Sequence, residues 1–307
     1  MWGIRLLFPI VLFFNVSAVA QIVPTAPTPT PVPGSRQANI PAIAADSEKY
    51  DRLKAIELMI PKDRIGSHPL LDPKKGIYRT PNKEEIEILA VDEPMLVRNA
   101  ALLKAPNTGI VKLNAESSCI SEADVVVASE ECLAYKMPGA GAAFSFRTES
   151  YRLARLADII LVDGIFRTGG VFQQVLVADI GDVAINDITL NTNGVKYLVG
   201  LKPVGDSDEF MRFDGEIQKG IEADGFLYRK GQPAKENSTF ALRSIAYRGN
   251  FIRSIDGIQY NELDFDKRRD VIVAFRVVDK DAAGNVTIVW KRLKDTEAPK
   301  LNLPELS

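Results

Sequence analysis

Clustered carboxylates are the residues of this chain that could do chemistry. Glu262, Asp264 and Asp266 alternate along YNELDFDK, so an extended backbone would place them on one face. A second acidic group lies in VGDSDEF and comprises Asp206, Asp208 and Glu209. Glycosidases need only two carboxylates at a suitable distance, and hard cations bind clustered oxygen ligands. Both groups are therefore candidate acidic or cation sites. The alternative is a solvated turn or strand face, because neither group fits the D-x-[DN]-x-[DN]-G calcium loop.

The sequence lacks the motifs of most other catalytic and cofactor sites. The one histidine, His68, lies in a Ser-His-Pro loop, so the chain cannot form H-E-x-x-H or a multi-histidine metal site. No G-x-S-x-G elbow or S-x-x-K pair is present. The segment MPGAGAAF lacks the third glycine of a dinucleotide site, and there is no P-loop. We therefore expect no catalytic set, no metal site and no cofactor.

A stretch of alternating aromatic and arginine residues is a candidate contact surface for a protein or a glycan. Such mixtures are common at contact surfaces, but an amphipathic strand pair with its arginines in water would show the same pattern. The six residues are Phe240, Arg243, Tyr247, Arg248, Phe251 and Arg253.

Charge and arginine spacing argue against a nucleic-acid partner. The formal net charge is −2, and no segment has the dense run of lysine and arginine that phosphate backbones require. Arg147, Arg152 and Arg155 are scattered among residues of predicted strands rather than clustered.

The first 45 residues indicate export. Residues 1–20 combine Arg5, an apolar run and the small residues Ala18 and Ala20, which is the pattern of a cleavable secretory signal. The apolar run of residues 6–16 is too short to span a bilayer, so we expect no membrane span after cleavage. Residues 21–45 are rich in proline and threonine, which predicts a disordered linker.

Two cysteines follow in the exported part, Cys119 and Cys132. An even number of cysteines in an oxidising compartment favours a disulfide within the chain. Two free thiols, or a metal site, are the alternatives that the spacing leaves open. A bridge would close a surface excursion around the apolar run at residues 124–129.

The chain that must position these residues begins with helices. Residues 46–105 predict a helical N-terminal segment with two or three short helices. Asn82 is available as an N-cap, Glu84 and Glu85 suit the first turn, and Pro94 divides the second helical run.

Two β regions follow, at residues 106–204 and 205–295, and a flexible tail at 296–307. Short apolar runs separated by Asp-Gly, Gly-Gly and Asn-Gly predict strands. The clearest pattern is a hairpin from Asp270 to Leu293. Its alternation places Val273, Phe275 and Val277 on a core face and Arg276 on the opposite face, where we expect its removal to change little.

The fold class predicted is mainly β (α+β), with antiparallel sheets in a sandwich or partly open barrel after short helices. The function expected is a secreted or periplasmic, non-enzymatic binding or structural component of the cell envelope. An envelope protein or a glycan would be its partner. The alternative is a carboxylate-dependent glycan hydrolase, which would differ by a concave site with two facing carboxylates.

Cleavage after Ala20 predicts Gln21 as the mature N-terminus. Mass spectrometry of the exported protein should give a mass that begins at Gln21. Recovery of exported protein that still carries residues 1–20 would contradict the signal assignment.

Overall fold

The computed structural model describes residues 68–115 and 137–302, which all belong to one compact unit, Asp46–Ser307. Several sequence-based predictions lie outside the described residues. They are the signal at 1–20, the linker at 21–45, the first predicted helix within 46–61, and the proposed Cys119–Cys132 pair.

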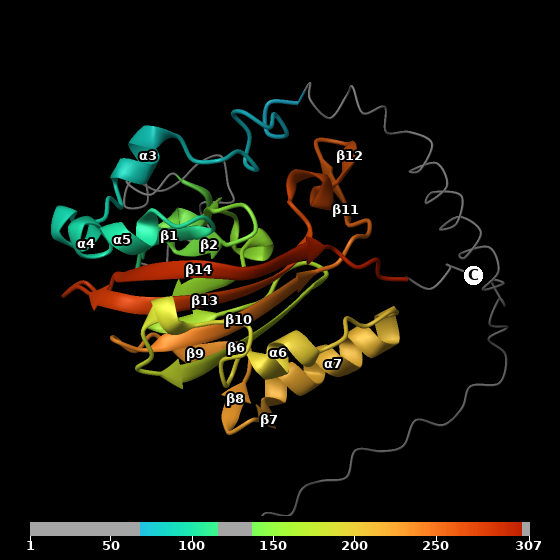
Figure 1. Ribbon diagram of the computed structural model, residues 1–307. Helices are drawn as coiled ribbons and strands as arrows, with labels where there is room; N and C mark the ends of the chain where they lie inside the picture. The colour runs from blue at the N-terminus through green and yellow to red at the C-terminus, as the bar shows by residue number, and fades with distance from the viewer. Residues whose placement is uncertain (1–67, 116–136, 303–307) are drawn as a thin grey trace, which may run out of the picture. The chain divides into compact units, whose positions relative to one another are not determined.

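The described residues form a mainly β, α+β structure of antiparallel sheets, as the sequence predicts, and the sheets do not close into a barrel. Sheet A has five strands in the order β1-β14-β13-β10-β6 (Figure 1). Its strands are β1 (Thr108–Leu113), β6 (Gln173–Gly181), β10 (Thr239–Ala246), β13 (Arg269–Lys280) and β14 (Val286–Glu297). Most of its strand order is set by antiparallel pairing between segments far apart in the chain.

Sheet B is also five-stranded and antiparallel, in the order β3-β2-β4-β5-β9. Its strands are short: β2 (Ala143–Ser145), β3 (Ser150–Tyr151), β4 (Ile159–Val162), β5 (Ile165–Arg167) and β9 (Gly231–Pro233). Two separate hairpins complete the strands, one of β7 (Ile221–Ala223) and β8 (Phe226–Tyr228), the other of β11 (Ile252–Ile255) and β12 (Ile258–Asn261).

The helices are short except for one. The described α-helices are α3 (Lys83–Glu87), α4 (Glu93–Arg98), α5 (Ala100–Leu103), α6 (Lys196–Gly200) and α7 (Ser207–Lys219). Single 3₁₀ turns lie at η4 (Pro138–Gly141), η5 (Ala154–Leu156), η6 (Ile185–Asp187) and η7 (Glu262–Phe265).

The main core lies between sheets A and B. Phe275 of β13 is fully buried and pairs across sheet A with Phe240 and Trp290. Its ring stacks on Phe240 with 5.0 Å between centroids and contacts Phe166 of sheet B edge-to-face at 5.1 Å. The hairpin predicted at Asp270–Leu293 is therefore present, and the core-facing parity of Phe275 is confirmed.

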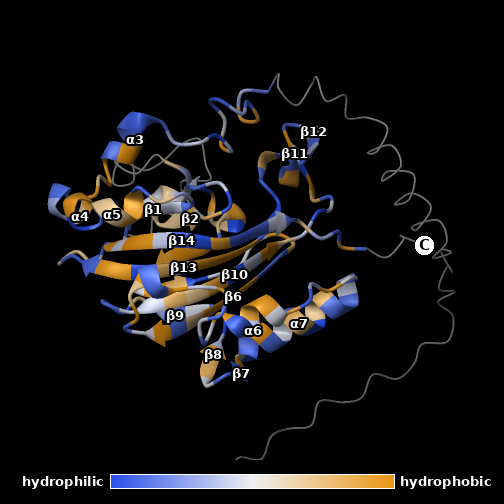
Figure 2. Cartoon of the chain, in the orientation of Figure 1, coloured by the Kyte–Doolittle hydropathy of each residue, from blue (hydrophilic) through white to orange (hydrophobic). Residues whose placement is uncertain are grey.

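The opposite face of sheet A is buried as well, which the hairpin pattern did not predict. Ile272 and Ala274 belong to a second core under α6 and α7, and Figure 2 shows β10 and β13 as largely apolar ribbons. Arg276 shares this covered side, and its guanidinium contacts Asp182 at 2.6 Å and the Val183 carbonyl at 3.2 Å. Arg276 therefore has partners that the sequence pattern did not reveal, while the small effect expected for its removal stays a prediction.

The first helical elements begin as the sequence indicates. The Asn82 side chain accepts the Glu85 backbone N–H at 2.9 Å, and the Glu85 carboxylate accepts the Asn82 N–H at 2.8 Å. This reciprocal capping box satisfies two of the unpaired N–H groups at the helix start. Pro94 lies in the first turn of α4, where its missing N–H costs no hydrogen bond.

Helix α7 interrupts the region that the sequence predicts as β from residue 205 onward. Asp206 caps it by accepting the Glu209 N–H at 2.8 Å, and the helix ends at Gly220, whose φ is 97°. The signals of a helix start and stop were therefore present. An apolar stripe was present as well, because Phe210, Phe213 and Ile217 recur at helical spacing and all three pack in apolar clusters of the fold. In the central region, Ile185–Asp187 and Lys196–Gly200 likewise form η6 and α6 instead of strands.

The end of the described chain packs more than the predicted flexible tail would. Ala298 and Leu301 are buried, and Leu301 joins a small cluster with Ile245 and Tyr247. Isolated bridges tie Lys300 to Arg248 and Asn302 to Asp206.

Replacement of Phe275 by alanine should lower the free energy of unfolding by about 3–5 kcal/mol, because the change opens a cavity between the two sheets. Urea titration of the purified protein measures this loss. Met211→Ala is a matched control, since Met211 is a large apolar side chain that is exposed on α7. Equal stability of the two variants would contradict the position of Phe275 in the core.

Candidate functional site

The densest polar group in the described structure is a cluster of arginines and carboxylates at one end of the sandwich. The cluster gathers residues from the loop after β2, from η5, from the β11–β12 hairpin and from the segment that leads into β13. We call it the arginine cluster. Its members are Arg147, Arg152, Arg155, Arg253 and Arg268, together with Asp158, Glu262 and Asp266.

Arg147 lies at the centre of the cluster, and its side chain is fully buried. Its Nε donates to Asp158 Oδ1 at 2.8 Å, and its Nη1 donates to Asp266 Oδ2 at 2.5 Å and to the Lys267 carbonyl at 2.8 Å. Its Nη2 donates to the Leu156 carbonyl at 2.7 Å. Burial alone would lower the pKa of this guanidinium, but Asp158 and Asp266 raise it above its ordinary value. Arg147 is therefore charged and paired inside the protein.

Asp158, which pairs with Arg147, also connects the two sheets. Its Oδ1 accepts Gln173 Nε2 at 2.7 Å and Ser244 Oγ at 2.6 Å, and both donors lie on sheet A. Its Oδ2 accepts Ser145 Oγ at 3.1 Å, and Ser145 lies on sheet B. These donors satisfy the hydrogen-bonding capacity of the buried Asp158 carboxylate.

Asp266 is held by two arginines. Its Oδ2 also accepts Arg268 Nη1, at 2.8 Å. Burial raises the pKa of Asp266, but Arg147 and Arg268 outweigh burial and hold it below its ordinary value. Its Oδ1 is buried, and no described residue donates to it.

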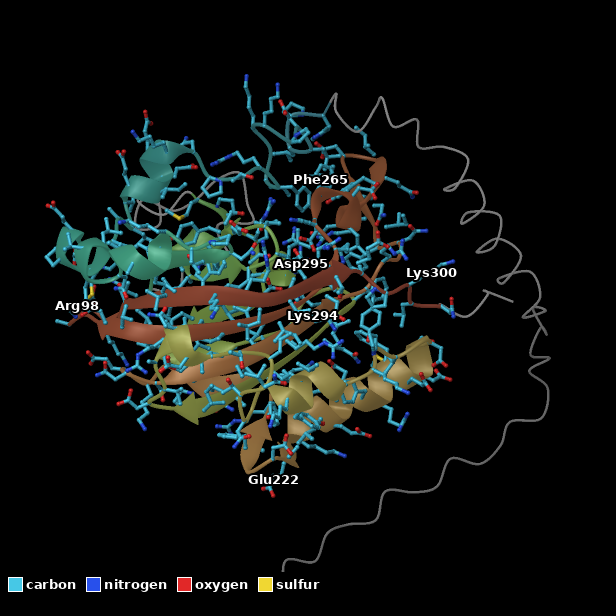
Figure 3. The ribbon with its side chains drawn as sticks, viewed as in Figure 1. Arg98, Glu222, Phe265, Lys294, Asp295 and Lys300 are labelled. Atoms are coloured by element: carbon cyan, nitrogen blue, oxygen red, sulfur yellow. The ribbon has the colours of Figure 1, made fainter. Side chains whose placement is uncertain are left out.

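Glu262 and the tyrosines Tyr78 and Tyr260 form the outer part of the cluster, and both tyrosine rings contact Phe265, which Figure 3 labels. The buried Glu262 carboxylate forms ion pairs with Arg155 and, at 3.3 Å, with Arg253. Arg155 Nη2 also donates to the Tyr78 hydroxyl at 3.3 Å, which bonds the Tyr260 hydroxyl at 2.7 Å. Burial, and then the bond to Tyr260, raise the pKa of Tyr78 well above its ordinary value. This part ties the loop at residues 68–80 to the β11–β12 hairpin.

The acidic face expected at residues 262–266 does not form, because residues 262–265 adopt the 3₁₀ turn η7 instead of an extended strand. The turn sends Glu262 and Asp266 to different arginines, while Asp264 stays exposed and accepts Asn261 Nδ2 at 2.9 Å.

The second acidic group is the start of helix α7. Asp206 is its N-cap, and the Glu209 carboxylate accepts a hydrogen bond from the Gly205 N–H at 3.2 Å. Asp208 lies in the first turn, where a negative charge favours the helix dipole. These three carboxylates stabilise a helix terminus, which accounts for their clustering in the sequence.

The predicted contact surface is not one surface. Phe240, Arg243 and Tyr247 are buried, and Arg243 pairs with both carboxylate oxygens of Asp270 at 2.7–2.9 Å. The remaining three members lie elsewhere: Arg248 is exposed, Phe251 is half-buried against Phe172, and the exposed Arg253 joins the arginine cluster. Aromatic and arginine residues occur together in this part of the sequence because strand β10, which carries Phe240 and Arg243, is buried on both faces.

Sequence reasoning missed the cluster because it took Arg147, Arg152 and Arg155 as scattered. A signal was available: three arginines fall within the nine residues 147–155, which lie between two apolar runs, and arginines that are buried by such neighbours need partners. The partners themselves, such as Asp266, could not be found from spacing.

In residues 68–115 and 137–302, no group of three or more histidine, cysteine, aspartate or glutamate residues could hold a metal ion. His68 contacts Asp256 at 3.0 Å and the Leu70 N–H at 3.2 Å. The described helices were also compared with the length of a membrane span, and none is long and apolar enough to cross a membrane.

Comparison with known proteins adds no family to this chain. No family model matches it, and neither a curated protein nor a solved structure shows a match. The described strands and helices by themselves define the broad class of the fold, which is an α+β protein with a two-sheet sandwich.

The Asp266→Asn variant should lose about 3–5 kcal/mol of stability at neutral pH, because it leaves Arg147 short of a buried partner. The folded-state pKa of Asp266 is lowered, so its contribution is present above about pH 4 and is lost as pH falls through that folded-state value. Urea titrations from pH 7 downward should show that the difference in the free energy of unfolding between the variant and wild type becomes smaller in acid. Asp264→Asn is the control, and an equal loss in that exposed neighbour would contradict the assignment.

The Tyr78→Phe variant should destabilise the loop at residues 68–80 by about 1–3 kcal/mol, because the Tyr260 hydroxyl loses its buried partner. Hydrogen exchange should be faster in this loop and unchanged in β13. Tyr197→Phe is the control, since Tyr197 is only half-buried on α6. Unchanged exchange in residues 68–80 would show that the tyrosine pair does not hold the loop.

Proposed function

We propose that this chain is a secreted or periplasmic, non-enzymatic binding or structural component of the cell envelope. The export pattern of residues 1–20 supports the location, and the proline- and threonine-rich residues 21–45 supply a tether for the folded part. The partner is an envelope macromolecule that the folded part contacts through its surface.

The observation that carries this proposal is the internal pairing of the buried carboxylates. Asp158, Glu262 and Asp266 each accept from arginines of the same chain, so their charge is used in holding segments together. Buried ion pairs that join separate segments rigidify a scaffold. Such a scaffold suits a protein that presents a fixed surface.

The glycan-hydrolase alternative gains no support from these carboxylates. A general acid in a glycosidase needs a pKa raised towards neutrality, so that it holds a proton at working pH. The pKa of Asp266 is instead lowered by Arg147 and Arg268. Glu262 is buried and forms ion pairs with Arg155 and Arg253 of the same chain.

The test uses the mature chain, residues 21–307, in two assays. Isolated cell envelopes should retain it saturably on sedimentation, and heat-denatured protein should not compete for those sites. Purified peptidoglycan and envelope polysaccharides should release no reducing ends. Release of sugar that is lost in a folded Glu262→Gln variant would overturn the non-enzymatic assignment, and failure to sediment would overturn the binding role.

A further inference from the structure

Arg152 is the member of the arginine cluster that forms no ion pair with a carboxylate of the described residues. The three carboxylates of the cluster pair with its other four arginines. Glu149, the carboxylate nearest to Arg152 in the sequence, pairs with Arg292 at 2.9 Å. A guanidinium does not lose its proton in proteins. Arg152 therefore carries a positive charge that no described carboxylate contacts.

Two hydrogen bonds hold the Arg152 guanidinium in place. Its Nη1 donates to the Tyr78 carbonyl at 2.9 Å, and its Nε donates to Thr148 Oγ1 at 3.3 Å. Tyr78 is itself anchored, because its ring stacks on Phe265 with 4.5 Å between the centroids; Phe265 is labelled in Figure 3. A side chain that the fold already orients loses little conformational entropy when it binds a ligand.

The third nitrogen of the guanidinium, Nη2, donates to no described residue. Among the described residues, the fully buried side-chain atoms without a partner are Arg229 Nε and Asp266 Oδ1. Arg152 is partly buried, and its Nη2 is not one of these atoms, so this nitrogen reaches the solvent. The N–H groups of Nε and Nη2 lie on one edge of the planar guanidinium. A ligand atom at Nη2 therefore lies beside the Thr148 hydroxyl.

Thr148 and Ser150 add hydroxyl groups beside this edge. Thr148 Oγ1 lies 3.0 Å from Ser150 Oγ, and both residues are partly exposed. Thr148 Oγ1 accepts from Arg152, so its own hydrogen can be donated to Ser150. The hydrogen of the Ser150 hydroxyl is then left for an acceptor outside the chain. The group thus presents N–H and O–H donors to the solvent.

The electrostatic surroundings of Arg152 favour a negatively charged ligand. Burial lowers the pKa of Arg152, Asp266 raises it, and the positive charge of Arg147 lowers it, which leaves the pKa below its ordinary value. The charged guanidinium is therefore less stable here than in water. A negative group at Nη2 would supply the missing countercharge. Hydrogen bonds from arginine to a carboxylate or a phosphate are also stronger than bonds between neutral groups.

We propose that Arg152, Thr148 and Ser150 form a binding site for an oxyanion, which is a phosphate or a carboxylate group. Arg152 Nη2 and the Ser150 hydroxyl donate to the oxygens of that group, and Thr148 orients both donors. The inference goes beyond the proposed function and does not depend on it, because a small anion is enough to define the site.

The probe is inorganic phosphate, titrated into the mature chain, residues 21–307, and followed by isothermal titration calorimetry. The ionic strength is held constant, so that the screening of charges is the same at every point. Wild type should bind phosphate saturably at one site. Arg152→Gln should bind at least about tenfold more weakly, the loss expected for one charge-assisted hydrogen bond. Ser150→Ala keeps the guanidinium and should also bind more weakly than wild type.

Arg167→Gln is the matched control, because Arg167 is an exposed arginine on β5 with no ion pair among the described residues. This variant should bind phosphate as wild type does. Equal weakening in Arg167→Gln and Arg152→Gln would overturn the assignment of the site. Circular dichroism verifies the fold of each variant, and Ser150→Ala decides the outcome where Arg152→Gln does not fold.

Acetate at the same ionic strength distinguishes the two anions. Binding of acetate alone that is lost in Arg152→Gln would retain the site and assign it to carboxylates. A folded Arg152→Gln variant that is less stable but binds either anion as wild type does would overturn the proposal, since Arg152 would then only hold the loop at residues 68–80. Absence of saturable binding of both anions to wild type would also overturn it.

Discussion

Burial of the Arg147 charge is the constraint on which the rest of this structure depends. A guanidinium taken out of water is tolerated only where carboxylates and carbonyls replace its hydration. Asp158 and Asp266 supply the charge, and Leu156 and Lys267 supply carbonyl oxygens. These partners come from separate segments, so the loop after β2, the turn η5 and the entry to β13 must meet at one place. The junction of the two sheets is thereby defined by polar geometry as well as by apolar packing.

Sheet A acts as the middle layer of the described unit. Its one face meets sheet B through Phe275 and Phe240, and its other face lies under α6 and α7 through Ile272 and Ala274. Strands in this setting are apolar on both sides, which removes the simple in-and-out alternation of a half-exposed sheet. Arginines that point away from the main core, such as Arg243, then need partners of their own. The buried Arg243–Asp270 pair is the second example of the same requirement.

The described residues include buried charged groups as well as exposed apolar side chains. Charged groups that could react with a ligand, such as Glu262 and Asp266, are neutralised within the fold. Apolar side chains such as Leu96 and Val97 remain exposed on helices that the core holds firmly. The proposed binding role rests on this use of the carboxylates within the fold.

The sequence by itself determined those features of the structure that depend on residues a few positions apart in the chain. The β13–β14 hairpin, the parity of Phe275 and the capping of α3 by Asn82 could all be predicted, because strand alternation and capping involve residues a few positions apart. The carboxylates Glu262 and Asp266 were singled out as candidates, yet the turn η7 separates them. Only the tertiary structure decided that Arg147 pairs with Asp266, a residue 119 positions away. A contact of that range depends on how two sheets are brought together, and no local pattern of residues records it.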